Sequence, residues 1–154
     1  MGMYGETVVH DGRETDYWVD DEPDGDRTVL YVHGSGCNTS VWVEQTDRSG
    51  VTSAGVDLSG HGGSADIGLD AGPGTMQAYA DDVDAVAAAV GADVLVGHSL
   101  GGAVVLTQLL DGDHAVSGAV VADSGSKLGV GPSLEGALGG DIDPVLSFMS
   151  KYDI

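Results

Sequence analysis

The apolar residues in the first third of the chain are grouped in short segments that have the length and pattern of β-strands. Residues 28–32 form a continuous apolar run, which is typical of a strand buried on both faces. The Asp11-Gly12 pair lies between two strand-like segments and favours a two-residue hairpin turn. We expect a short helix over residues 39–45. The strands predicted in this part of the chain cover residues 6–10, 14–19, 28–32 and 51–56.

Helical periodicity replaces this pattern from residue 75 onward. Apolar residues recur three or four positions apart between residues 76 and 90, which predicts an amphipathic helix. Thr75 is expected to cap its N-terminus, and Gly91 is expected to end it. The aspartates predicted to face water from this helix are Asp81, Asp82 and Asp84.

Strands and helices then alternate. Residues 94–96 and 116–122 are predicted strands, and residues 100–110 between them form a predicted helix. This alternation indicates a parallel sheet with helices packed on its faces. The fold class we predict is α/β, with a mostly parallel sheet of about six strands. The pattern weakens after Asp123, although residues 141–154 have the spacing of an amphipathic helix.

The charge balance excludes several classes of function. The 154-residue chain has 25 acidic and 5 basic residues, which gives a formal net charge of −20. Such a surface repels nucleic acids and anionic lipids, so we expect neither as a partner. The composition is similar to that of proteins from salt-loving microbes, in which salt screens the repulsion. The acids are scattered and lack the spacing of a Ca²⁺-binding loop, so no metal site is predicted.

Cysteine usage and hydropathy limit the cellular context. Cys37 is the only cysteine, which excludes an intrachain disulfide and a cysteine-based metal site. The sequence shows no basic-then-apolar leader and no apolar stretch of about 18 residues. We therefore expect a cytoplasmic protein that does not enter a membrane, and no metal or organic cofactor.

The segment Gly97-His98-Ser99-Leu100-Gly101 carries the clearest chemistry. It is a G-x-S-x-G motif between a predicted strand and a predicted helix. In that setting the serine occupies a strained turn that exposes its hydroxyl, and the glycines allow strand and helix to approach closely. Ser99 is therefore a candidate nucleophile, and it requires a base to take its proton.

Three motifs together resemble the N-terminal part of the α/β-hydrolase fold superfamily. His33-Gly34, followed by Trp42, resembles its oxyanion segment, and residues 57–64 (DLSGHGGS) resemble its D-x-x-G-H-G-x-S loop. Residues 97–102 resemble its nucleophile elbow. The resemblance covers residues 5–125. It implies a core over residues 1–123, followed by the start of a cap-like or C-terminal helical segment over residues 124–154.

This resemblance also implies a mechanism. Ser99 would attack the carbonyl of a small ester or other acyl substrate, and the backbone N–H groups of Ser35 and Leu100 would form the oxyanion hole. A serine at this position disfavours haloalkane substrates, for which relatives use aspartate. Ester, lactone, amide and carbon–carbon substrates stay open, and no cofactor is implied.

The chain departs from the family where the catalytic acid and base would follow. The family sheet has about eight strands, and the loops that carry its late acid and histidine have no counterpart here. Asp123 follows the sixth strand, where some relatives place the acid, although a strand-end aspartate commonly contacts a loop amide instead. The histidines at positions 33, 61 and 98 belong to the motifs and are expected to be structural, and those at positions 10 and 114 are expected at the surface.

The missing base leaves several functional hypotheses. The first is a carboxylesterase-like serine hydrolase whose isolated turnover is weak. The second is a non-catalytic binding module derived from a hydrolase. The third is a site completed by a second chain, since residues 116–122 would form an open sheet edge that favours pairing. A phosphate-binding role for Gly34-Ser35-Gly36 ranks below these, because G-x-G-x-x-G spacing and a P-loop lysine are lacking.

Overall fold

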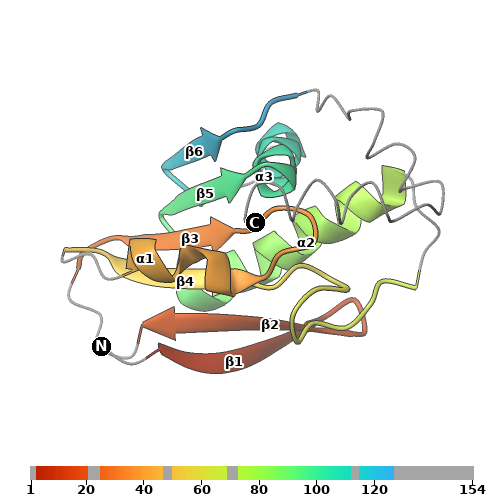
Figure 1. Cartoon of the computed structure of the whole chain (residues 1–154), viewed down its shortest axis with the longest axis horizontal. Helices are drawn as coiled ribbons and strands as arrows, with labels where there is room; N and C mark the ends of the chain where they lie inside the picture. The colour runs from red at the N-terminus through yellow and green to blue at the C-terminus, as the bar shows by residue number, and fades with distance from the viewer. Residues whose placement is uncertain (1–2, 21–24, 47–49, 69–72, 112–114, 127–154) are drawn as a thin grey trace, which may run out of the picture.

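A single six-stranded sheet organises the chain in the computed structural model, which describes residues 3–20, 25–46, 50–68, 73–111 and 115–126 (Figure 1). The strand order is β1-β2-β4-β3-β5-β6, and the last four in this order are parallel. The strands are β1 (Met3–His10), β2 (Arg13–Asp20), β3 (Thr28–Val32), β4 (Thr52–Val56), β5 (Val94–His98) and β6 (Gly118–Ala122). The helices are η1 (Thr39–Trp42), α1 (Val43–Thr46), α2 (Pro73–Val90) and α3 (Leu100–Asp111). The predicted α/β class and six strands are confirmed.

The N-terminal hairpin forms as its turn residues require. β1 and β2 pair in antiparallel register, with His10 opposite Arg13. The two loop residues, Asp11 and Gly12, have φ angles of 48° and 73°. Two consecutive positive φ angles are the signature of a type I′ turn, whose twist matches that of the flanking strands. β2 then pairs antiparallel to β4, which adds the hairpin to the edge of the parallel sheet.

The handedness of the crossovers decides which helices cover which face. The chain moves in one direction from β3 to β4, and in the opposite direction from β4 to β5 and on to β6. Since parallel crossovers are right-handed, this reversal places α1 on one face of the sheet and α2 and α3 on the other. Figure 1 shows this arrangement, with α1 on the near side of the sheet and α2 on the far side.

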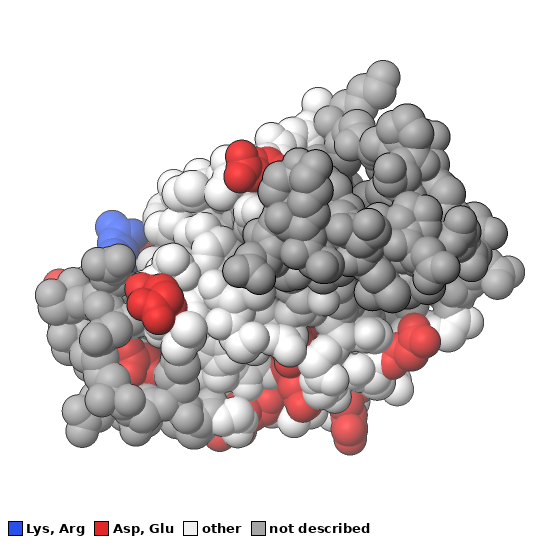
Figure 2. Space-filling view, in the orientation of Figure 1, with Lys and Arg blue, Asp and Glu red and all other residues white. Residues whose placement is uncertain are grey.

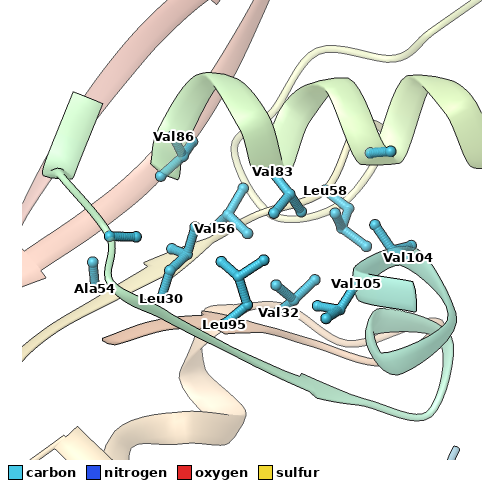
Figure 3. Packing of buried hydrophobic residues seen from close by; sticks show 12 residues of the cluster. Leu30, Val32, Ala54, Val56, Leu58, Val83, Val86, Leu95, Val104 and Val105 are labelled. Atoms are coloured by element: carbon cyan, nitrogen blue, oxygen red, sulfur yellow. The ribbon is translucent and has the colours of Figure 1, made fainter. Parts of the chain in front are cut away.

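The hydrophobic core fills the space between the sheet and the pair α2 and α3 (Figure 3). Leu30 and Val32 of β3 point into it, together with Leu95 of β5, and all three are fully buried. Among the described residues, the helices on the opposite face are shorter, because η1 and α1 span only eight residues between them. There Tyr31 packs against Trp42, with ring centroids 5.1 Å apart.

The ends of α2 differ partly from the prediction. The helix begins at Pro73, two residues before Thr75, so the predicted N-cap at Thr75 is wrong. A proline is favoured in the first helical turn, where its missing N–H leaves no hydrogen bond unmade. Gly91 ends the helix as predicted, with a φ of 65°. The Ala92 N–H bonds the Ala87 carbonyl at 2.9 Å, which is the Schellman closure that a left-handed glycine allows.

Two residues predicted at the surface are buried. Asp82 was expected to face water, but its side chain is fully buried, and the His10 side chain is only 14 % exposed. The reason is that the β1–β2 hairpin lies against α2, so part of the polar face of the helix is covered. Asp84 is exposed as expected. His114 and residues 127–154, which include the predicted helix and most of the cap-like segment, lie outside the described residues.

Acidic side chains dominate the charged surface. Asp and Glu are distributed over the face seen in Figure 2, where few basic side chains appear. No helix in the described segments has the length and apolar character that a bilayer crossing requires. At the sheet edge, β6 exposes about half of Val120.

Candidate active site

The three sequence motifs meet at one edge of the sheet, because they follow the carboxyl ends of parallel strands. Residues 33–37 follow β3, residues 57–64 follow β4, and Ser99 follows β5. The chain leaves β3 toward one face and β5 toward the other, which makes the gap between these neighbouring strands a topological switch point. Open α/β sheets bind ligands at such points.

The elbow forces the Ser99 backbone into a strained conformation. Ser99 has a φ of 51°, a left-handed value that a non-glycine residue adopts only when its surroundings impose it. Those surroundings are packed backbone. A Cβ on Gly97 would lie 2.4 Å from the Gly101 carbonyl oxygen, and a Cβ on Gly101 would lie 2.3 Å from the Val32 carbonyl oxygen. The glycines therefore let α3 pack directly against β5 and β3.

Backbone hydrogen bonds fix the elbow on both sides of the serine. The Ser99 N–H donates to the Ala122 carbonyl at 3.0 Å, which ties the turn to the end of β6. The Ser99 carbonyl accepts from the Gly102 N–H at 3.0 Å, the Ala103 N–H at 3.2 Å and the Ser124 Oγ–H at 2.5 Å. Because both backbone groups of Ser99 are engaged, the direction of its Cα–Cβ bond is fixed.

The oxyanion segment lies directly against the elbow. A Cβ on Gly34 would lie 3.3 Å from Ser99 Cβ and 3.2 Å from His98 Nδ1, so a side chain there would crowd the elbow. The Gly34 carbonyl accepts from His33 Nδ1 at 2.7 Å and from the Cys37 N–H at 3.2 Å. Since the C=O and N–H of a trans peptide point in opposite directions, these bonds turn the Ser35 N–H away from them. Within the described segments that N–H has no protein acceptor.

Burial keeps His33 in its neutral form. Desolvation lowers the pKa of His33, against the smaller raising effect of its bond to the Gly34 carbonyl. Its Nε2 accepts from the Leu58 N–H at 3.1 Å, so the ring is protonated on Nδ1 alone. The imidazole thereby joins the loop after β3 to the loop after β4. His33 is structural, in agreement with the sequence prediction.

The start of α3 supplies a second set of free donors. Leu100 is its first residue, and the initial N–H groups of a helix have no partner within it. The positive end of the helix dipole also lies at this corner. The Leu100 N–H makes no hydrogen bond to the described protein groups. The amides of Ser35 and Leu100, predicted to form the oxyanion hole, thus come from two segments that flank Ser99.

The loop after β4 is hydrogen-bonded to the segment that follows the oxyanion residues and to the hairpin. Asp57 Oδ1 accepts from the Thr39 N–H at 2.8 Å, and its Oδ2 accepts from the Gly63 N–H at 3.2 Å. Ser64 Oγ donates to the Asp57 carbonyl and accepts from the Asp16 N–H at 2.8 Å. These bonds join the loop to η1 and to the hairpin. They explain why a motif without a catalytic group accompanies the elbow.

No described histidine is hydrogen-bonded to Ser99. The two ring nitrogens of His33 and of His61 are both engaged elsewhere, and His10 bonds Thr15 and Asp82. His98 lies edge-on to Trp42, with ring centroids 6.4 Å apart. None of the described histidines is therefore placed as a hydrogen-bonded base for Ser99.

Asp123 lies beside the elbow, directly after the residue whose carbonyl accepts from the Ser99 N–H. It follows β6, its side chain is exposed, and its φ of 46° is a left-handed value. A role as the catalytic acid and a contact with a loop amide both stay predictions for this residue.

Sequence reasoning missed two residues that shape the site. Ser124 bonds the Ser99 carbonyl, and Asp82 receives both the N–H and the hydroxyl of Ser59, at 2.8 Å and 3.0 Å. Nothing in the local sequence marks Ser124, because its partner lies 25 residues away. The signal that could have marked Asp82 is its position in the helix. Once the hairpin is folded against α2, that position is interior, and an acid at an interior position requires partners. The described residues include no cluster of His, Cys, Asp or Glu that could hold a metal ion.

Comparisons with known proteins agree on the fold. A model of the alpha/beta hydrolase family matches residues 29–153. A solved structure of a thermophilic esterase has a TM-score of 0.76 at 24 % identity, with 96 % of this chain and 55 % of that chain covered. Est816, described as an N-acyl homoserine lactone degrading enzyme, has a TM-score of 0.70 at 27 % identity, with coverages of 88 % and 52 %. An esterase from Exiguobacterium antarcticum has a TM-score of 0.60 at 27 % identity, with coverages of 71 % and 42 %.

The coverage of these matches is one-sided. The chain spans about half the length of the solved structures that it matches. No curated protein matches the sequence.

Proposed function

The chain belongs to the alpha/beta hydrolase family, and from this premise we propose that it carries the nucleophile and oxyanion hole of a carboxylesterase-like serine hydrolase. Ser99 is the proposed nucleophile, and the N–H groups of Ser35 and Leu100 are the proposed oxyanion donors. The observation that carries this proposal is the positive φ of Ser99 at a strand-to-helix corner against which Gly34 packs closely, since a Cβ on Gly34 would lie 3.3 Å from Ser99 Cβ. Stabilisation of developing charge by such donors is commonly the largest catalytic contribution.

The proposed substrate is a small molecule with an ester, lactone or similar acyl bond. Ser99 Oγ attacks the carbonyl carbon and loses its proton to a base, and the carbonyl oxygen becomes an oxyanion beside the two amides. Collapse of this intermediate expels the alcohol, which takes up a proton, and leaves an acyl-enzyme that water hydrolyses. Two of the matched structures, an esterase and a lactone-degrading enzyme, support this class.

The general base that would take the Ser99 proton is proposed to lie elsewhere. Because no described histidine bonds Ser99, we propose that the base comes from outside the described residues or from a second chain at the β6 edge. Residues 1–123 would form the catalytic core, and residues 124–154 would begin a cap-like or C-terminal helical segment. The protein is proposed to act in the cytoplasm.

A fluorophosphonate probe tests the nucleophile directly, because its phosphorus reacts with the serine while its phosphoryl oxygen occupies the oxyanion hole, which favours a serine placed beside such donors. We expect labelling of the wild-type chain and its loss in Ser99→Ala. Ser35→Ala is the matched control: it removes a hydroxyl beside the elbow but keeps the N–H that we assign to the oxyanion hole. Labelling that persists in Ser99→Ala, or that is absent from the wild type, would contradict the proposal.

A second candidate function, a binding module without turnover, is favoured by the same lack of a described base. Hydrolysis of a nitrophenyl ester separates the two. Oxyanion stabilisation and binding alone leave about 10³–10⁴-fold acceleration over water. We expect the isolated chain to fall in this range, and kcat values of roughly 1–10³ s⁻¹, typical of complete enzymes, would refute that expectation. Size-exclusion chromatography in high salt tests whether a second chain is involved.

A further inference from the structure

His61 connects the loop after β4 to the oxyanion segment through its imidazole ring. Its Nδ1 lies 3.1 Å from the Ser59 carbonyl oxygen, and its Nε2 lies 3.3 Å from the Gly36 nitrogen. A carbonyl oxygen only accepts and a backbone N–H only donates. Both contacts are therefore hydrogen bonds only when the ring is neutral and carries its proton on Nδ1.

The far end of this connection is anchored in the core. The Ser59 N–H and Oγ–H both donate to Asp82, at 2.8 Å and 3.0 Å, and Asp82 is fully buried in α2. The His61 N–H also donates to the Leu58 carbonyl at 2.9 Å. The ring is therefore held from a rigid helix, while its Nε2 points to an exposed loop residue.

The other end of the connection is the Gly36 N–H, which lies next to the proposed oxyanion donor, the Ser35 N–H. Gly36 has a φ of 71°, so it turns the chain sharply, one residue after Ser35. His33 Nδ1 bonds the Gly34 carbonyl and so fixes the Gly34–Ser35 peptide from one side. The ring centroids of His33 and His61 lie 5.0 Å apart. The bond from the Gly36 N–H to His61 Nε2 fixes the turn at Gly36 from the other side. With both held, the Ser35 N–H has little freedom to turn away from the elbow.

We propose that His61 is a positioning residue that orients the Ser35 N–H through Gly36, with Asp82 and Ser59 holding the ring in place. This inference rests on the proposed function for its catalytic consequence, because the Ser35 N–H matters only if it receives an oxyanion. The hydrogen-bond connection itself does not depend on catalysis, and it is tested separately.

Nuclear magnetic resonance of the wild-type chain tests the connection without any activity. At pH 7.5 we expect ¹⁵N shifts of His61 that show protonation on Nδ1 alone, and a scalar coupling across the bond between the Gly36 nitrogen and His61 Nε2. In His61→Leu the Gly36 amide should exchange faster with solvent. A ring that is protonated on Nε2, or a Gly36 amide that His61→Leu does not affect, would overturn the inference.

Labelling by a fluorophosphonate tests the catalytic consequence. In His61→Gln the Oε1 atom can accept from the Gly36 N–H, whereas in His61→Leu no acceptor is left. We expect about tenfold slower labelling of Ser99 in the leucine variant, less than the roughly 10²–10³-fold loss for deleting an oxyanion donor, and near-normal labelling in the glutamine variant. Equal impairment of the two variants, or none in either, would refute a positioning role. If the wild type is not labelled, the proposed function fails, and the resonance experiment still decides the role of His61.

Discussion

Replacing Asp82 by alanine should destabilise the protein more than any other single change at an aspartate in α2. Its carboxylate is fully buried and contacts five donors. Oδ1 lies 3.0 Å from His10 Nε2, 3.1 Å from Thr15 Oγ1, 3.4 Å from Arg13 Nη2 and 3.0 Å from Ser59 Oγ, and Oδ2 lies 2.8 Å from the Ser59 nitrogen. The carboxylate joins α2 to the hairpin and to the loop after β4.

The size of the expected loss in unfolding free energy follows from the groups that lose their partner when the Asp82 carboxylate is removed. Removing one partner of a buried ion pair costs about 3–5 kcal/mol, because the remaining charge and donors stay desolvated and unpaired. Alanine recovers up to about 0.7 kcal/mol of helix propensity. We therefore expect the free energy of unfolding to fall by about 3 kcal/mol, which lowers the melting temperature by roughly 6–12 °C for a domain of this size.

Asp81→Ala is the matched control, because it makes the same change one residue earlier in the same helix. Within the described segments, the only hydrogen bond of the Asp81 side chain is to the exposed Gln77 amide, at 3.1 Å. Urea unfolding followed by circular dichroism measures both variants, and the propensity gain cancels in the comparison. A loss in Asp82→Ala that does not exceed the loss in Asp81→Ala would refute the reasoning.

Three further predictions address the elbow, the buried histidine and the surface charge. Gly101→Ala should destabilise by about 1–3 kcal/mol, because its Cβ would meet backbone oxygens of Val32 and His33, whereas Gly118→Ala meets nothing within 4 Å and should be nearly neutral in urea unfolding. Burial lowers the pKa of His33 below its unfolded value of about 6.5, so the unfolded state takes up a proton first as the pH drops. The free energy of unfolding should therefore fall below about pH 6.5. In a profile of the urea midpoint against pH, His33→Gln should lack this component. The net charge of −20 should make the melting temperature rise with NaCl, mostly below about 0.5 M, where the screening length changes fastest; a flat or falling curve would contradict this.

The sequence predicted those features that depend on backbone geometry and local periodicity. The hairpin turn at Asp11-Gly12, the strand at residues 28–32 and the helix end at Gly91 all formed as expected. Each follows from a constraint that a few neighbouring residues carry, namely a positive φ or an apolar run. The sites of close backbone approach at Gly97 and Gly101 belong to the same class.

Contacts between distant elements could not be predicted in this way. Asp82 fits the polar face of an isolated amphipathic helix, and only the packing of the hairpin against α2 makes that position interior. His10 was misplaced at the surface for the same reason, since its partner lies 72 positions away along the chain. A single sequence shows the period of a helix, but it does not show which part of the helix another element will cover.

The candidate site divides catalysis into a part made of backbone and a part made of side chains. The proposed oxyanion donors are two N–H groups, and glycines at positions 34, 97 and 101 bring their segments together. Such a site depends on close approach of backbone segments, so it should tolerate substitution of Ser35 better than substitution of its neighbour Gly34, where a Cβ would crowd the elbow. A general base, by contrast, requires one imidazole placed within about 3 Å of Ser99 Oγ by another strand end. In the described segments both proposed oxyanion donors are present, whereas no histidine is hydrogen-bonded to Ser99, so binding of an oxyanion and turnover of a substrate should be separable properties of this chain.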